Sequence, residues 1–236
     1  MKELKPIFHS IQKFSLIDYP GYICMIFFTK GCNFRCSYCH NPELVIGKEK
    51  CNLSVENITD ILKKRKNVVE AISICGGEPT LHENLIQWAK YIKKQGYKIK
   101  LDTNGTNPKM IKELIANKLI DFFAVDYKAP LKKYKNITKR DLKENEFLES
   151  LKLILTSGID YELRTTIHSD LHSKEDIEEM IRELKKLGVK NYYLQKFVKA
   201  PKTLEDLKET TQNKSLVEMG LHQLKGNFEN FGIRNV

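Results

Sequence analysis

The sequence predicts an α/β fold: a partial (β/α)6 barrel, open on one side, with a short N-terminal extended segment. Short apolar runs rich in β-branched and aromatic residues alternate with amphipathic stretches along the 236 residues, and about six such pairs can be counted. Strands that alternate with helices form a parallel sheet with right-handed crossovers. Six pairs are too few to close an eight-stranded barrel, so we expect an open barrel with its ligand site at the carboxyl ends of the strands.

The expected strands are short and bounded by turn residues. An extended segment covers residues 8–14, and the barrel strands cover 22–28, 71–75, 97–103, 121–126, 160–167 and 191–197. The expected helices begin at residues that can cap or open a helix, and several end before a glycine. They cover residues 55–66, with Ser54 as the cap, and 81–95, 108–117, 142–156 and 174–187.

No Gly/Ser/Pro-rich linker divides the chain, so we expect a single domain over residues 1–236. Its core is expected at about 14–200. Helical patterns at 204–209 and 215–231 predict a C-terminal helical segment at about 204–236.

The composition is ordinary for a globular protein, with 41% hydrophobic and 30% charged residues. No stretch approaches the roughly 20 apolar residues of a membrane span, and the N-terminal sequence lacks the pattern of a signal peptide. We therefore expect a cytoplasmic protein in which the six cysteines are not paired as disulfides. The net charge of +10 comes from lysines spread along the chain. Without a compact basic tract with interleaved aromatic residues, we expect no nucleic-acid partner, although a face for an acidic partner is an alternative.

Cys32, Cys36 and Cys39 crowd into eight residues directly after the first barrel strand. Thiolates bind soft metals such as zinc and the iron of iron–sulfur clusters. A structural zinc site needs four ligands, and His40 could be the fourth, although its position next to Cys39 is awkward for a tetrahedral site. A four-iron cluster usually takes four thiolates, so three leave one iron open to a cofactor. The spacing favours such a cluster, with a zinc site and a redox thiol pair as alternatives.

The stretch "CNFRCSYC", with Tyr38 just before the third cysteine, resembles the radical S-adenosylmethionine (radical SAM) superfamily. The resemblance implies a partial barrel of that type, one 4Fe-4S cluster on the three cysteines, and S-adenosyl-L-methionine as cofactor. It places Tyr38 and His40 beside the cluster and the adenosine end of the cofactor. Because Cys24, Cys51 and Cys75 are scattered, no second cluster is expected.

The next expected strand ends in "GGEPTL", and two glycines before a glutamate let backbone approach a ligand closely. The stretch resembles the Gly-Gly-Glu motif of the superfamily. By that resemblance Gly76, Gly77 and Glu78 hold the methionine amino group of the cofactor. Cys75 replaces the usual small hydroxyl residue and is expected to be a small buried residue.

The two following strands end in "LDTNG" and "VDYK", which place polar side chains at the site edge of the sheet. Asp126 and Lys128 lie two apart, on the same side of an extended chain. Both stretches resemble the branch of the superfamily that activates glycyl radical enzymes. The resemblance implies a possible monovalent cation on Asp102, Thr103 and Asp126, with Lys128 near the cofactor. Asn104 is a further candidate for cofactor binding.

Arg164, in the otherwise apolar strand of residues 160–167, is expected to face a pocket or an anion, and its position resembles an arginine of the activating branch. Gln195 stands where pyruvate formate-lyase activating enzymes carry a ribose-contacting histidine, so it is a weak candidate for the cofactor. His168 and His172 are expected on a loop and receive no role.

The resemblance extends from about residue 14 to 197, and is greatest to proteins named anaerobic ribonucleoside-triphosphate reductase activating protein of the longer type, which are similar to pyruvate formate-lyase activating enzyme. It implies an oxidoreductase that cleaves S-adenosylmethionine to a 5′-deoxyadenosyl radical and generates a glycyl radical on a partner enzyme such as anaerobic ribonucleotide reductase. Flavodoxin or ferredoxin is the expected electron donor. The alternatives are activation of pyruvate formate-lyase, a radical SAM reaction on a small molecule, and a non-enzymatic zinc or redox binding module.

Overall fold

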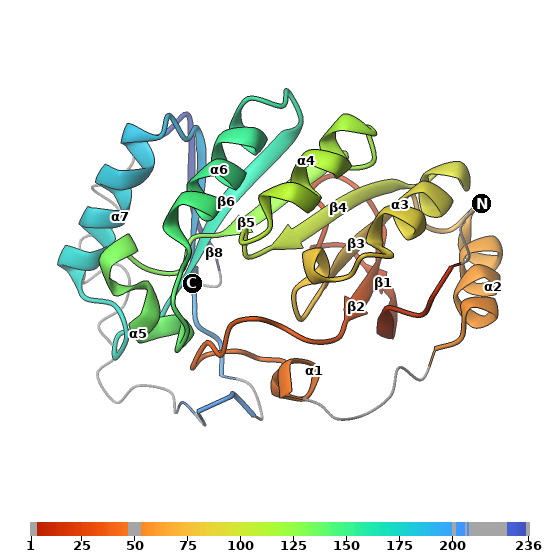
Figure 1. Cartoon of the computed structure of the whole chain (residues 1–236), viewed down its shortest axis with the longest axis horizontal. Coiled ribbons are helices and arrows are strands. Elements are labelled where there is room, and N and C mark those ends of the chain that lie inside the picture. Colours follow the sequence, from red (N-terminus) through yellow and green to blue (C-terminus); the bar gives the residue numbers. More distant parts are fainter. Residues whose placement is uncertain (1–3, 47–52, 200–201, 206, 208–225, 235–236) are drawn as a thin grey trace.

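The computed structural model describes residues 4–46, 53–199, 202–205, 207 and 226–234. These residues form one eight-stranded sheet in which the strands are adjacent in chain order, from β1 to β8. Figure 1 shows the curved sheet and the helices α2, α3, α4, α6 and α7, which form an arc around its outer side. The strands are β1 (Phe8–Ser15), β2 (Cys24–Thr29), β3 (Ala71–Gly76), β4 (Lys98–Thr103), β5 (Phe122–Asp126), β6 (Asp160–Ile167), β7 (Asn191–Lys196) and β8 (Asn230–Arg234).

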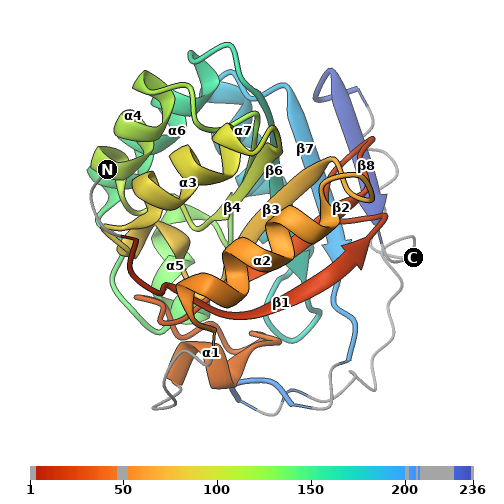
Figure 2. The ribbon, with the colours of Figure 1, turned by 90° about the vertical axis from the view of Figure 1, so that its right-hand side faces the viewer.

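β1 pairs antiparallel with β2, and every later pair in the sheet is parallel. The parallel strands therefore deliver their carboxyl ends to the same edge, as expected for an open barrel. Figure 2 shows α2 lying in front of the strands and α3 and α4 beside it on the outer side. The helices are α1 (Pro42–Ile46), α2 (Val55–Arg65), α3 (Leu85–Lys94), α4 (Pro108–Ala116), α5 (Tyr134–Thr138), α6 (Glu144–Leu155) and α7 (Lys174–Lys186), with short 3-10 turns at Pro79–Leu81 and Leu131–Lys133.

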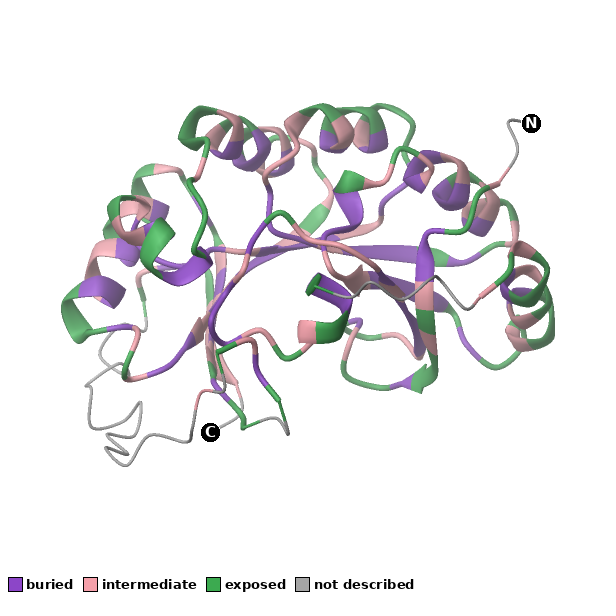
Figure 3. Cartoon of the chain, turned by 60° about the horizontal axis from the view of Figure 1, so that its bottom comes forward, coloured by how far each residue is buried: buried purple, intermediate pink, exposed green. Residues whose placement is uncertain are grey.

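The two faces of the parallel strands have opposite character, because successive side chains of a strand point to opposite faces. The outer face is apolar and packs with the helices: Ile74, Leu101 and Val125 are fully buried in the main core. Figure 3 shows that the buried residues of the outer helices face the strands. The inner face is polar or charged where β3 to β6 lie side by side, and its residues include Ser73, Lys100, Asp102, Asp126, Glu162, Arg164 and Thr166.

Local sequence signals explain where several helices begin. The Ser54 side chain accepts a hydrogen bond from the Asn57 backbone N–H, and the Ser54 backbone N–H donates to Asn57 Oδ1, which forms the capping box of α2. Ser173 and Asp176 form the same arrangement at α7. Pro108 opens α4, where its missing N–H costs nothing. No helix among the described residues is both long and apolar enough to span a membrane.

All the expected strands are present, and none of their ends is shifted by more than two residues. The helix expected over 81–95 begins only at Leu85, because Pro79–Leu81 forms a separate 3-10 turn. The short helices α1 and α5 were not predicted, since five residues are too few for a periodic pattern.

The expected C-terminal helical segment is wrong where the structure describes it. Residues 204–205 lie in a turn, and Asn230–Arg234 forms β8, which adds a seventh parallel strand beside β7. Phe231 and Ile233 alternate with Gly232 and pack against the core, which is the two-residue period of a strand. Leu207 has no regular secondary structure, and residues 226–229 form a turn and bends. Residues 206, 208–209 and 215–225 of the two expected helices lie outside the described part, as does Cys51.

Candidate functional site

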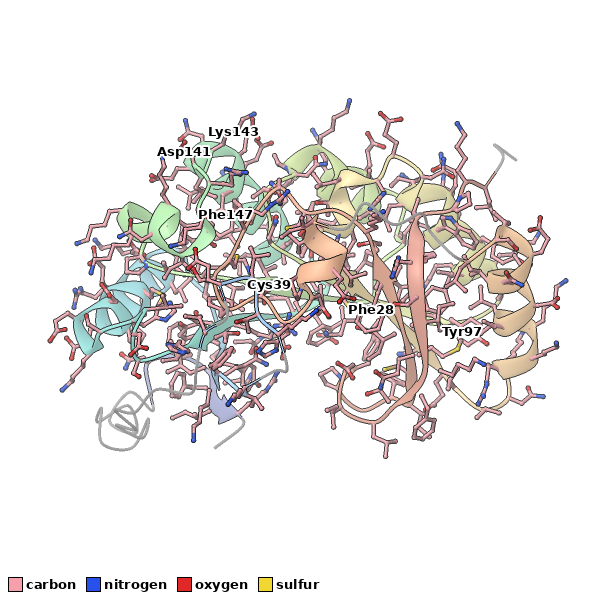
Figure 4. The ribbon with its side chains drawn as sticks, turned by 90° about the horizontal axis from the view of Figure 1, so that it is seen from below. Phe28, Cys39, Tyr97, Asp141, Lys143 and Phe147 are labelled. Atoms are coloured by element: carbon pink, nitrogen blue, oxygen red, sulfur yellow. The ribbon has the colours of Figure 1, made fainter. Side chains whose placement is uncertain are left out.

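A cavity of about 230 Å³ lies at the carboxyl ends of the parallel strands. Figure 4, which views the molecule from below, places Cys39 near the middle of this side of the molecule. The cavity is lined by Cys32, Phe34, Cys36, Tyr38, Cys39, His40, Asn41, Val45, Cys75, Gly76, Gly77, Glu78, Asp102, Thr103, Asn104, Asp126, Lys128, Arg164 and Thr166. All the predicted site residues except Gln195 are therefore brought together around one space.

The loop that carries the three cysteines is held by hydrogen bonds within the protein. Gly31 N donates to Leu44 O at 2.8 Å, and Arg35 N donates to Thr138 O at 2.8 Å, so α1 and α5 both support the loop. The Arg35 guanidinium donates to Cys32 O at 2.6 Å and to Phe34 O at 2.7 Å. These hydrogen bonds within the protein hold the cysteine loop in one conformation, as a preorganised ligand site requires.

Burial disfavours the charged form of the three thiols. It raises the pKa of Cys32 to about 12, with the neighbouring Glu78 carboxylate adding to the effect. Burial also raises the pKa of Cys36 and of Cys39. Cysteine binds a metal as the thiolate, so a bound cationic centre would be needed to hold these three sulfurs in the deprotonated form.

The donor set suits an iron–sulfur cluster. Three thiols line one cavity, and thiolates are the usual protein ligands of such clusters. His40, the fourth ligand of the zinc alternative, instead packs its ring against Phe197 at 5.1 Å between centroids. Cys75 also lines the cavity, from the end of β3.

Gly76 and Gly77 bring the end of β3 against the start of the cysteine loop. Gly77 N donates to Thr29 O at 2.9 Å, and Glu78 N donates to Gly31 O at 2.7 Å. Gly76 has φ +111°, and a Cβ there would lie 2.5 Å from the backbone of Thr29. Both glycines therefore admit the chain's own backbone, and both also line the cavity, so their contact with a ligand stays a prediction.

Glu78 is 1% exposed and receives four hydrogen bonds. Its Oε1 accepts from Thr103 Oγ1 at 2.7 Å and from the hydroxyl and backbone N–H of Thr80 at 2.5 and 3.1 Å. Its Oε2 accepts from Asn104 N at 2.7 Å. Burial raises the pKa of Glu78, and these hydrogen bonds act in the opposite direction. Oε2, with one protein donor, keeps acceptor capacity for a cationic ligand on the cavity side.

The inner ends of β4, β5 and β6 carry a network of charges. Asp126 Oδ1 accepts from Arg164 at 3.0 and 3.2 Å, and Asp126 Oδ2 accepts from Lys128 Nζ at 3.1 Å. Burial would raise the pKa of Asp126, but these two cations outweigh it and lower the pKa to about 2. Burial opposes the charge of Lys128, yet Asp126 keeps its pKa well above the usual value. Asp102 pairs with Arg164 at 3.4 Å and with Lys100.

Asn104 directly follows β4 and connects it to the cysteine loop. Its side-chain amide donates to Asn33 Oδ1 at 2.8 Å and reaches Cys32 Sγ at 3.9 Å. Tyr38 is buried, and Lys128 Nζ lies 6.0 Å from its ring centroid. Both residues thus line the cavity, and their contact with a cofactor stays a prediction.

The cavity is not lined by Gln195 or by the pair His168 and His172. Gln195 is on β7 opposite Thr166 and does not line the cavity. His172 Nε2 lies 2.9 Å from Lys128 O, and the His168 backbone N–H donates to His172 Nδ1 at 3.3 Å. The pair therefore lies on the loop after β6, as expected, and supports the Lys128 backbone.

Sequence reasoning missed several lining residues. Thr166 follows Arg164 by two positions on the same strand, so the two-residue period could have revealed it. Asn41 and Val45 reach the cavity beside or within α1, a helix too short to predict.

Comparisons with known proteins agree with this geometry. The profile of the radical SAM superfamily matches residues 26–184. A protein of Methanocaldococcus jannaschii, provisionally named as a glycyl-radical enzyme activating enzyme, is 34% identical over 242 aligned residues, which cover 96% of this chain and 100% of the relative. The pyruvate formate-lyase-activating enzyme of Clostridium pasteurianum is 32% identical over 191 residues, which cover 76% of each chain.

Solved structures show the same fold. The crystal structure of Streptococcus suis SuiB bound to S-adenosylmethionine superposes with a TM-score of 0.68 at 16% identity, over 88% of this chain and 49% of SuiB. At that identity the match supports the partial barrel alone, and the present chain spans about half of SuiB. The profile covers more than half of the chain and the M. jannaschii relative aligns over nearly all of it, so the protein belongs to the radical SAM superfamily, in its branch of glycyl-radical enzyme activating enzymes.

Proposed function

We propose that the protein generates a glycyl radical on an anaerobic ribonucleotide reductase, with S-adenosylmethionine bound in the cavity described above. The observation that carries the proposal is the convergence of Cys32, Cys36, Cys39 and Glu78 with the charged ends of β4 to β6 on one space. The thiols would hold a metal centre, and the charged side chains would hold an amino acid moiety.

Membership of the superfamily implies a 4Fe-4S cluster and S-adenosylmethionine. When bound, a cluster with one open iron supplies an electron that breaks a carbon–sulfur bond of the sulfonium. Cys32, Cys36 and Cys39 would be its ligands. Phe34 N, which donates to Cys32 Sγ at 3.3 Å, orients one of them. Buried Phe34 and Val45 give the cavity an apolar wall that excludes water.

The other lining residues supply charges that match the two ends of an amino acid. Glu78 offers carboxylate oxygens to an ammonium group, while Lys128 and Arg164 present cations that suit a carboxylate. Tyr38, His40 and Asn104 are left for the cluster side and the adenosine. Gln195 stays a candidate for the ribose, outside the described cavity.

The protein substrate is proposed to be a glycine in a loop of the partner enzyme. The motifs between residues 14 and 197 resemble activators of anaerobic ribonucleotide reductase, which supports that partner. The C. pasteurianum relative supports pyruvate formate-lyase as the second candidate. Flavodoxin or ferredoxin is proposed as electron donor, and the cytoplasm as the place of action.

The test uses protein reconstituted with iron and sulfide without oxygen, reduced, and mixed with S-adenosylmethionine and each candidate partner in turn. Electron paramagnetic resonance then measures glycyl radical per partner subunit. We expect a glycyl radical with the reductase and little with pyruvate formate-lyase. A signal confined to pyruvate formate-lyase would overturn the choice of partner, and 5′-deoxyadenosine without a radical on either would point to a small-molecule substrate.

A further inference from the structure

Lys100 is a charged side chain within the barrel and is not among the predicted site residues. It lies on β4, two residues before Asp102, and its side chain is 2% exposed. Its ammonium group pairs with Asp102 Oδ1. Burying an ammonium is costly unless it is paired, so this contact places a fixed positive charge directly beside the Asp102 carboxylate.

Arg164 supplies a second fixed charge between the two aspartates. Its Nη1 lies 3.4 Å from Asp102 Oδ1, and its Nε and Nη2 donate to Asp126 Oδ1 at 3.2 and 3.0 Å. Lys128 occupies the other oxygen of Asp126 at 3.1 Å. Arg164 Nη1 also lies 3.7 Å from Glu162 Oε1, but Glu162 has a cation of its own in Arg234, which donates to it at 2.6 and 3.1 Å. Asp102 and Asp126 therefore face three protein cations and carry no excess negative charge that would attract a metal ion.

The third group expected to hold a monovalent cation is also engaged. Thr103 donates its hydroxyl proton to Glu78 Oε1 at 2.7 Å and accepts from Gly105 N at 3.1 Å. A hard monovalent cation binds best to oxygen atoms that have no competing cation beside them. Asp102, Thr103 and Asp126 do not fit that requirement in this chain.

We propose that the Lys100 ammonium, together with Arg164, replaces the monovalent cation at this site. Lys100 acts as a positioning residue. Its ammonium group neutralises Asp102, so Asp102 does not take up the whole charge of Arg164. Part of the Arg164 charge is then available to a carboxylate in the cavity. The inference rests on the proposed binding of S-adenosylmethionine. It predicts that binding needs no alkali metal ion.

The first test compares the reconstituted wild-type protein in potassium chloride, sodium chloride and tetramethylammonium chloride at equal ionic strength. We expect the dissociation constant of S-adenosylmethionine and the rate of 5′-deoxyadenosine formation to agree within about twofold, because each fixed protein charge stays in place in all three salts. The melting temperature of the metal-free protein should likewise be the same. Binding that is lost in tetramethylammonium and restored by potassium would overturn the inference. An absence of cleavage in every salt would instead contradict the proposed function.

The second test uses Lys100→Met, which removes the charge and keeps an unbranched chain. We expect binding of S-adenosylmethionine about tenfold weaker in tetramethylammonium chloride, the effect of losing one charge interaction near the site, with partial recovery in potassium chloride. Lys100→Arg should stay independent of the salt. Lys98→Met is the matched control, because Lys98 lies on the same strand but is exposed and contacts Tyr22 instead. If Lys100→Met binds as the wild type does in all salts, Lys100 has no such role; if it does not fold, the wild-type comparison decides alone.

Discussion

Gly77 lies so close to Gly31 that a Cβ atom on Gly77 would fall 1.9 Å from the Gly31 carbonyl oxygen. Glu78, the next residue, donates its backbone N–H to the same oxygen at 2.7 Å. The carboxylate proposed for the cofactor amino group and the loop that carries the thiols are thus parts of one packed unit. A change that separates the backbones of Gly31 and Gly77 should therefore affect both.

Replacing Gly77 by Ala should separate the two segments. Because the added methyl group would overlap backbone that cannot rotate away, we expect a loss of about 3 kcal/mol or more in the free energy of unfolding, together with reduced iron content. Denaturant titration and iron analysis measure these effects. Gly158→Ala is the control, since a Cβ atom there would have no other atom within 4 Å and only the φ of +73° opposes it; there we expect about 1 kcal/mol. Equal effects at the two positions would show that the contact does not matter.

Glu78→Gln should separate nucleotide binding from cluster assembly. The amide removes the negative charge that we assign to the cofactor ammonium, so we expect binding of S-adenosylmethionine at least about tenfold weaker, with iron content unchanged. Glu183→Gln is the control, because Glu183 accepts from Tyr127 at 2.7 Å and does not line the cavity. Normal binding by Glu78→Gln would remove Glu78 from the proposed site.

Asp126 should stabilise the fold only while it is ionised. Its pKa is lowered from 3.8 to about 2 in the folded protein, so its contribution is complete above the unfolded value and is lost as the pH falls through the folded value. The side chain is 37% exposed, so solvent screening limits the expected contribution to about 1 kcal/mol. The difference in unfolding free energy between the wild type and Asp126→Asn should therefore shrink between about pH 4 and pH 2. A difference that stays constant across this range would contradict the pairing with Lys128 and Arg164.

Arg234 should stabilise β8, the strand in which it lies, through its ion pair with Glu162. The guanidinium donates to both oxygens of Glu162, at 3.1 and 2.6 Å, and the Glu162 side chain is 3% exposed. Arg234→Ala leaves that buried carboxylate with Arg164 alone, at 3.7 Å, so we expect a loss of about 2 kcal/mol. Adding Glu162→Gln should recover part of this loss in a double-mutant cycle. Additive effects would show that the pair is not coupled.

Much of this architecture follows from local sequence patterns. The barrel strands and the helices capped by Ser54 and Ser173 carry their signals within a few residues, and the polar strand ends indicate the edge where the site lies. Features that depend on contacts between distant segments were missed or misread. The role of Gly77 depends on Gly31, 46 positions earlier, and the engagement of Asp102 depends on Arg164, two strands away.

β8 shows a different limit. Its pattern of Phe231 and Ile233 is only five residues long, and it becomes a strand because β7 offers an unpaired edge. Lys100 was overlooked because a lysine beside apolar residues usually indicates an exposed position, although it precedes Asp102 by two positions on the same strand and so shares its face of the sheet.

The most direct test of the account is anaerobic reconstitution of the wild type, Cys36→Ala and Cys24→Ala, followed by reduction and addition of S-adenosylmethionine. Cys24 is the matched control, because it is buried in β2 and does not line the cavity. The account predicts about four iron atoms per chain and formation of 5′-deoxyadenosine for the wild type and Cys24→Ala, and neither for Cys36→Ala. One zinc ion per wild-type chain, or a full iron complement without 5′-deoxyadenosine, would contradict it.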